Sequence, residues 1–223
     1  MDCMMRRLGI SVLLSLALTA GHAPTATAQL ASNPNLNAQL LVGARQGDLK
    51  LVERVLAQGA APNSRNRLGK TPLLLAAEKG DMALAELMLK AGAHVDQASL
   101  EGVTPLMAAS YGGHVELARR LLDAGASTAS VDRMKKTAMI YAAGQGHAAV
   151  VALLLDRGVD VNAAYDNELT ALMWAAGQGQ AEAVSLLLAR GADRSLRDAR
   201  GMTAADIARQ AGHAPIVLLL AAS

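Results

Sequence analysis

Residues 71–92 read TPLLLAAEKGDMALAELMLKAG, and residues 104–125 repeat the pattern as TPLMAASYGGHVELARRLLDAG. The opening threonine recurs every 33 positions without an insertion, as Thr71, Thr104, Thr137, Thr170 and Thr203. Two glycine series keep the same step: Gly47, Gly80, Gly113, Gly146, Gly179 and Gly212, and Gly59, Gly92, Gly125, Gly158 and Gly191. A period of this length is typical of stacked helical repeats, so the function is to be sought on the surface of an array.

Each unit carries start and stop signals for two helices. Thr71 can cap a helix, and proline is well tolerated at the first helical position that follows. Gly80 can supply the left-handed backbone that ends this helix. A second helix is predicted over residues 82–90, and the polar stretch from Gly92 to the next threonine is predicted to form an extended hairpin loop.

Leucines of the second helices are expected to fill the space between neighbouring units. One helix pair cannot bury its own apolar face, whereas stacked pairs bury one another. Leu122, Leu155 and Leu188 are therefore expected to share one buried position between repeats.

The Thr-Pro-Leu strings, the alanine-rich helices that follow them, and the Gly-His and Gly-Ala pairs resemble the ankyrin repeat over roughly residues 36–223. The resemblance implies an all-α solenoid of about six helix-loop-helix units with hairpin loops, stacked into a curved array whose concave face binds proteins. The histidine that usually follows Thr-Pro-Leu is replaced here, and the replacements are Leu74, Met107, Ile140, Met173 and Asp206.

The N-terminus has the layout of a secretory signal peptide. Arg6 and Arg7 precede an apolar run over residues 8–20, and small residues lead to Ala28, where cleavage is expected. The predicted domains are a signal peptide (1–28), a flexible lead (29–36) and the repeat domain (37–223), whose repeats are 37–65, 66–98, 99–131, 132–164, 165–197 and 198–223. The protein is thus expected to be periplasmic or secreted.

The composition of the chain argues against nucleic acid and stable membrane insertion. The chain has 21 basic and 19 acidic residues and a formal net charge of +2, which argues against bulk affinity for nucleic acid. The apolar run near the N-terminus is too short for a stable membrane anchor. Cys3, the one cysteine, precedes the expected cleavage site, so the mature chain is expected to have no disulfide.

No set of residues predicts a catalytic, cofactor or metal site. His114, His147 and His213 share one position of the period, which spaces them about 8–10 Å apart, too far for a common zinc ion. They are expected to make polar contacts at helix starts. Methionines such as Met88, Met107 and Met139 are expected to fill the core, although an exported, Met-rich protein also leaves copper binding open.

Partner-binding residues are expected on the hairpin tips and the inner helices of repeats two to five. The three tyrosines and the single tryptophan all lie in repeats three to five, and Tyr111 shares its position with Gly144 and Gly177, which predicts an aromatic edge beside a shallow floor. The candidates are Arg67, Lys70, Tyr111, Arg133, Met134, Lys136, Gln145, Tyr165, Trp174 and Gln178.

Two further features concern the loops and the C-terminal end. Lys135 and Glu168 stand where other hairpins have glycine. These two tips are expected either to keep a left-handed backbone, at a cost on the order of 1 kcal/mol relative to glycine, or to adopt another turn. Leu218 occupies a position that is polar or small in earlier repeats. It indicates either a weak self-association surface on an otherwise monomeric protein or a frayed last turn.

The sequence therefore predicts a non-enzymatic, exported protein that binds another protein, with an acidic surface, as adaptor, chaperone or inhibitor. The alternative is an accessory protein that binds a small apolar ligand or copper through its methionine and aromatic inner surface. A ligand site needs donor atoms that converge on one point, whereas a protein site needs a broad exposed surface.

Overall fold

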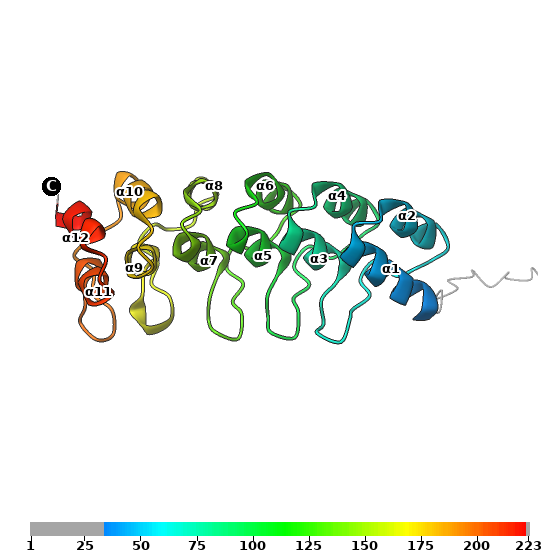
Figure 1. Cartoon of the computed structure of the whole chain (residues 1–223), viewed down its shortest axis with the longest axis horizontal. Helices are drawn as coiled ribbons and strands as arrows, with labels where there is room; N and C mark the ends of the chain where they lie inside the picture. The colour runs from blue at the N-terminus through cyan, green and yellow to red at the C-terminus, as the bar shows by residue number, and fades with distance from the viewer. Residues whose placement is uncertain (1–33, 222–223) are drawn as a thin grey trace, which may run out of the picture. The chain divides into compact units, whose positions relative to one another are not determined.

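The structure is a computed structural model that describes residues 34–221, and its described part is all-helical, as predicted (Figure 1). The first helix begins at Pro34, inside the stretch expected to be a flexible lead, and the expected signal peptide lies outside the described residues. The helices are α1 (Pro34–Gln46), α2 (Leu49–Ala57), α3 (Pro72–Lys79), α4 (Met82–Lys90), α5 (Pro105–Tyr111), α6 (Val115–Asp123), α7 (Ala138–Gln145), α8 (Ala148–Asp156), the 3-10 turn η1 (Asp166–Glu168), α9 (Ala171–Gly177), α10 (Ala181–Ala189), α11 (Ala204–Gln210) and α12 (Ala214–Ala221).

The helices form two layers. Each odd-numbered helix packs against the next odd-numbered one, from α1 to α11, and against the even-numbered helix that follows it. The even-numbered helices form the second row, and the hairpin loops extend beyond the odd-numbered row (Figure 1). The odd-numbered helices and the loops therefore form one continuous face.

The predicted caps are present. Thr71 Oγ1 accepts a hydrogen bond from the Leu74 backbone N–H at 3.1 Å, and Gly80 ends α3 with φ of 70°. The residues that replace the family histidine have a local role. The sulfur atoms of Met107 and Met173 lie 3.4 and 3.5 Å from the backbone nitrogens of Thr104 and Thr170, whose N–H groups point at them. These side chains therefore close the helix N-termini from within their own repeat.

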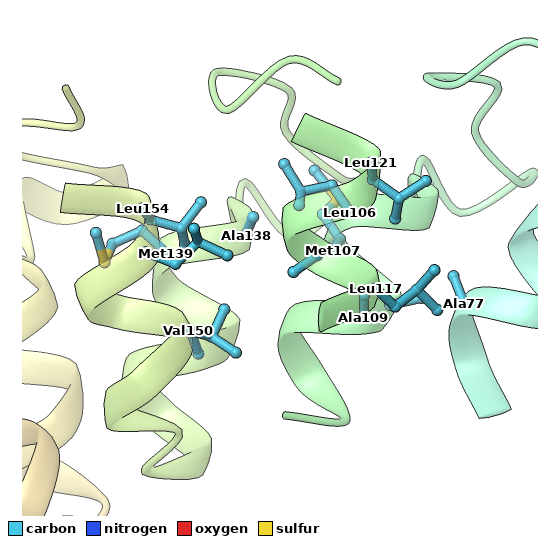
Figure 2. Packing of buried hydrophobic residues seen from close by; sticks show 14 of the residues in the cluster. Ala77, Leu106, Met107, Ala109, Leu117, Leu121, Ala138, Met139, Val150 and Leu154 are labelled. Carbon is cyan, nitrogen blue, oxygen red and sulfur yellow. The ribbon is translucent and has the colours of Figure 1, made fainter. Parts of the chain in front are cut away.

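The structure corrects the expected position of the core leucines. Leu122, Leu155 and Leu188 are only half-buried, whereas the preceding residue of each helix is fully buried. A step of one residue turns an α-helix by about 100°, which moves a side chain off the packed stripe. The buried row comprises Val55, Met88, Leu121, Leu154, Leu187 and Leu220, and Figure 2 shows Leu121 and Leu154 within the packed cluster.

Polar side chains hold most of the hairpins from inside. Asn66 Oδ1 accepts hydrogen bonds from the backbone N–H groups of Leu68 and Lys70 at 2.9 and 3.0 Å. Asp132 and Asp198 make the same pair of bonds to their own loops. In the fifth repeat this position is Tyr165, whose side chain cannot accept in this way, and the loop forms η1 instead.

Both residues that replace a hairpin glycine adopt a left-handed backbone, and the fifth repeat also forms a different turn. Lys135 and Glu168 have φ of 60° and 59°, and Asn167 adds a third non-glycine residue with φ of 56°. Two of these three residues lie in the loop of the fifth repeat, so the departure from the common hairpin is concentrated there.

The loops of the fourth and fifth repeats are the least connected neighbours. Backbone hydrogen bonds of 3.0 Å join the tips of the other adjacent hairpins, from Leu100 N–H to Leu68 O, from Arg133 N–H to Glu101 O and from Ala199 N–H to Asn167 O. Within residues 34–221 no such bond joins the fourth tip to the fifth.

A side-chain bond is also missing between the same two loops, residues 124–137 and 157–170. Asn63 accepts from His94 N–H at 2.8 Å, Asp96 from Ser127 N–H at 3.0 Å, and Asn162 from Asp193 N–H at 2.8 Å. The equivalent residue is Ala129, whose side chain has no oxygen that could accept a hydrogen bond from the Asp160 N–H. The backbone bond between tips and the side-chain bond are therefore both missing between these two loops.

We expect Leu154→Ala to lower the free energy of unfolding by about 2–5 kcal/mol, because it removes buried methyl groups and leaves a cavity. Leu155→Ala should cost clearly less, since Leu155 is half-buried, and Leu187→Ala should cost less than Leu154→Ala because the array loosens toward its end. Urea denaturation of the three variants checks this order. Equal losses for Leu154→Ala and Leu155→Ala would contradict the assigned packing.

We expect Ala129→Asn to raise the free energy of unfolding by about 0.5–1.5 kcal/mol, because the new amide oxygen can accept from Asp160 N–H. The reverse variant, Asn162→Ala, removes the corresponding natural bond and should lose at least as much. Thermal and urea denaturation measure both. A neutral Ala129→Asn beside a destabilising Asn162→Ala would show that the two junctions differ in backbone geometry.

Candidate protein-binding site

Three of the four aromatic side chains gather on the face of the odd-numbered helices. The rings of Tyr111 and Tyr141 meet edge to face, with centroids 5.8 Å apart and planes at 83°. Trp174, from the next helix of the row, lies with Tyr141 around the ammonium group of Lys136. The Lys136 nitrogen is 4.8 Å from the Trp174 ring centroid and 5.6 Å from that of Tyr141, which is cation–π distance.

These side chains surround a hollow of about 120 Å³, which we call the aromatic hollow. It brings together five of the ten residues predicted from the sequence, namely Tyr111, Lys136, Gln145, Trp174 and Gln178. Ile140, Tyr141 and Gly144 complete its lining. Residues from three adjacent repeats therefore converge on one point.

Gly144 forms the floor of the aromatic hollow. A Cβ atom at this position would come no closer than 3.9 Å to Trp174 and 4.0 Å to Gln178, so the space above the glycine is open to a further group. Gly144 thus supplies a shallow floor beside the aromatic edge. Gly177, predicted to share this floor, does not line the hollow, and a Cβ atom there would lie 3.0 Å from Ile207 Cγ2. Tyr111 is 54% exposed, which leaves its ring available to a partner.

Hydrogen bonds between repeats hold the helices that carry the hollow. His147 Nε2 lies 2.9 Å from the Tyr111 carbonyl oxygen, and Gln180 Nε2 donates to the Gly144 carbonyl oxygen at 3.1 Å. His147 precedes α8 but makes no cap bond to that helix, so its polar contact is to the end of α5 and not at the helix start as expected. Among residues 34–221 no group of three or more histidine, cysteine or acidic side chains is placed to hold a metal ion.

Tyr141 and Asp132 position Lys136, a role that the sequence pattern did not indicate. The Tyr141 hydroxyl donates a hydrogen bond to Asp132 Oδ2, while Asp132 Oδ1 accepts from the N–H groups of Met134 and Lys136 at 2.8 and 2.9 Å. Burial, together with the neighbouring Asp132 carboxylate, raises the pKa of Tyr141. The loop that carries Lys136 is thereby fixed to helix α7.

Met134 and Tyr165 lie on the other side of the Lys136–Trp174 wall. They line a smaller hollow of about 40 Å³ that shares Lys136 and Trp174 with the aromatic hollow. Tyr165 also borders an open apolar hollow of about 450 Å³ at the weakly connected junction, with Ala129, Val131 and Val159. Burial raises the pKa of the Tyr165 hydroxyl.

The remaining predicted residues do not join this site. Lys70 forms an ion pair of 2.6 Å with Glu78, and Arg133 forms one of 3.3 Å with Glu101. Arg67 is exposed on the second hairpin. The basic side chains at the tips are therefore partly neutralised by acidic neighbours.

The C-terminal end presents a separate apolar surface. Leu218 is 73% exposed on α12 and lines an open hollow with Val217 and Arg209. Helix α12 extends through Ala221, so Leu218 lies within a helix of the described chain. The exposure predicted for this position is confirmed.

Comparison with known families identifies the repeat. A family model described as ankyrin repeats in three copies matches residues 40–132, 92–165 and 140–223. A search of curated proteins finds no match. The chain belongs to the ankyrin-repeat family. Ankyrin repeats generally mediate protein–protein interaction and are typically non-enzymatic. None of the helices between residues 34 and 221 has the length and apolar character needed to cross a bilayer.

Proposed function

We propose that this chain is an exported, non-enzymatic protein that binds another protein through its hairpin tips and odd-numbered helices, as adaptor, chaperone or inhibitor. The aromatic hollow is the observation that carries the proposal. Tyrosine and tryptophan side chains around a partly desolvated space are typical of the few residues that dominate binding energy at interfaces. The surrounding exposed tips supply a broader rim.

The methionines favour this function over copper binding. The sulfur atoms of Met107 and Met173 face N–H groups of their own repeats, and Met88 and Met139 are buried in the core. Their positions are those of packing residues, and they do not converge on a point as ligands of one ion would. A small apolar ligand remains the second candidate, since the 450 Å³ hollow lies within the usual size range of ligand pockets.

The export part of the proposal rests on the N-terminal sequence alone. We expect protein recovered from the native cell to begin at or near Gln29, because the charged start, apolar run and small residues are those of a cleaved signal peptide. Intact-mass measurement of protein from the periplasm or the medium checks this. Recovery of the chain from Met1, mainly in the cytoplasm, would contradict export.

We expect Tyr111→Ala and Trp174→Ala to speed dissociation of a partner captured by cross-linking in the native compartment, with a loss of about 2 kcal/mol or more. Arg67→Ala should instead slow association, and its effect should fade at high salt because exposed charges are screened beyond about 8 Å at physiological ionic strength. Arg133→Ala should change association less, since Glu101 already pairs with Arg133.

Unfolding of each variant is measured first, because Trp174 is partly buried and its truncation also removes packing. Binding kinetics at two salt concentrations then separate the two groups of residues. Unchanged binding by all four variants, with folding intact, would move the site away from this face and toward Leu218.

A further inference from the structure

Lys70 and Lys136 occupy the same position of the period, two repeats apart, but have different partners. In the second repeat, Lys70 Nζ lies 2.6 Å from Glu78 Oε1. In the fourth repeat, the residue equivalent to Glu78 is Gly144, which has no side chain. The cation is kept at this position, and the carboxylate that neutralises it two repeats earlier is absent from the sequence.

Lys136 is not neutralised by another route. No ion pair within residues 34–221 includes Lys136, although Lys70 and Arg133 on the same face are both paired. Its ammonium lies against Trp174 and Tyr141, and its side chain is only partly exposed. The aromatic faces attract the charge but accept none of its three N–H bonds in the way an oxygen does. A partly desolvated cation of this kind gains more from an anionic partner than an exposed one does.

The space around Lys136 fits one carboxylate. The floor at Gly144 is open, since a Cβ atom there would have its nearest neighbours at 3.9 and 4.0 Å, and the hollow holds about 120 Å³. Gln145 and Gln178 line the same hollow and carry amide donors that can bind a second carboxylate oxygen. Tyr111 and Trp174 offer apolar surface to the atoms next to the carboxylate.

We propose that the aromatic hollow binds a glutamate side chain of the partner protein, seated over Gly144 against Lys136 in the place that Glu78 takes against Lys70. This inference rests on the proposed function, because it names the chemistry that the partner presents at that surface. The partner supplies the carboxylate that the fourth repeat lacks. A single ammonium balances the one negative charge of a carboxylate, whereas a phosphorylated side chain carries about −1.5 to −2.

The test uses the mature full-length protein and peptides selected on it from a displayed random library. We expect the selected peptides to share an acidic residue at one fixed position, and replacement of that residue by glutamine to weaken binding by about tenfold or more. Trp174 is the single tryptophan of the chain, so its fluorescence reports occupancy of the hollow directly.

Variants of the protein test where the carboxylate of the peptide binds. Gly144→Glu supplies the missing acid from the chain itself, so it should pair with Lys136 and reduce binding of the acidic peptide by about tenfold or more. Gly144→Ala separates the effect of filling the floor from the effect of charge: it adds a Cβ atom without a charge, so it should weaken binding clearly less than Gly144→Glu. Lys136→Met should make the acidic and glutamine peptides bind alike, whereas Lys70→Met should not.

Different results would contradict the carboxylate site and the proposed interaction face. Selected peptides without a fixed acid, equal binding of the glutamine peptide, or full binding by a folded Gly144→Glu variant would overturn the carboxylate site. If Tyr111→Ala and Trp174→Ala still abolished binding, the face would remain the interaction surface. Binding that requires a free peptide C-terminus in place of the internal acid would also overturn the glutamate assignment.

Discussion

The structure depends on burial between neighbouring repeats. No helix pair can cover its own apolar side, so each pair is stable only against the next one. The row from Val55 to Leu220 is buried at every step of the period, and paired alanines such as Ala142 and Ala143 let the inner helices approach closely. The strict 33-residue spacing is consistent with this requirement, since an insertion within a helix would rotate the buried row off the packed face.

This constraint acts on the stacked faces and leaves the outward positions free to differ. One position of the period differs in four successive repeats, where it is Glu78, Tyr111, Gly144 and Gly177. Its side chain is thus a carboxylate, then an aromatic ring, and is absent in the two glycines. Such changes alter the surface without altering the stack. The aromatic hollow arises from a few of these changes placed side by side, with Lys136 and Trp174 contributed by adjacent repeats.

The junction between the fourth and fifth repeats combines a packed side and a weakly connected side. Toward the inner helices, Gln180 and the Lys136–Trp174 contact join the two repeats. Toward the loops, the tip-to-tip backbone bond is absent among the described residues. Ala129 also stands where other repeats have an asparagine or aspartate that accepts a hydrogen bond from the next loop. Asp132 and Tyr141 compensate on one side by fixing the loop of the fourth repeat to α7. The residues of the loop that carries Lys136 are thus held from within their own repeat more than from the neighbouring loop.

Local chemistry repeated at a fixed interval was sufficient to determine the all-α class, the threonine caps and the glycine stops, because each depends on residues a few positions apart. It did not predict that α1 begins at Pro34, inside the stretch expected to be a flexible lead, or decide the backbone conformation of Lys135 and Glu168. Only the tertiary structure decided which leucine of each pair is buried, since the packing angle between helices selects the stripe. It also decided that Lys70 and Arg133 are paired while Lys136 lies on Trp174. Those outcomes depend on the directions of side chains that meet across a loop or between repeats, and the order of residues along the chain does not specify those directions.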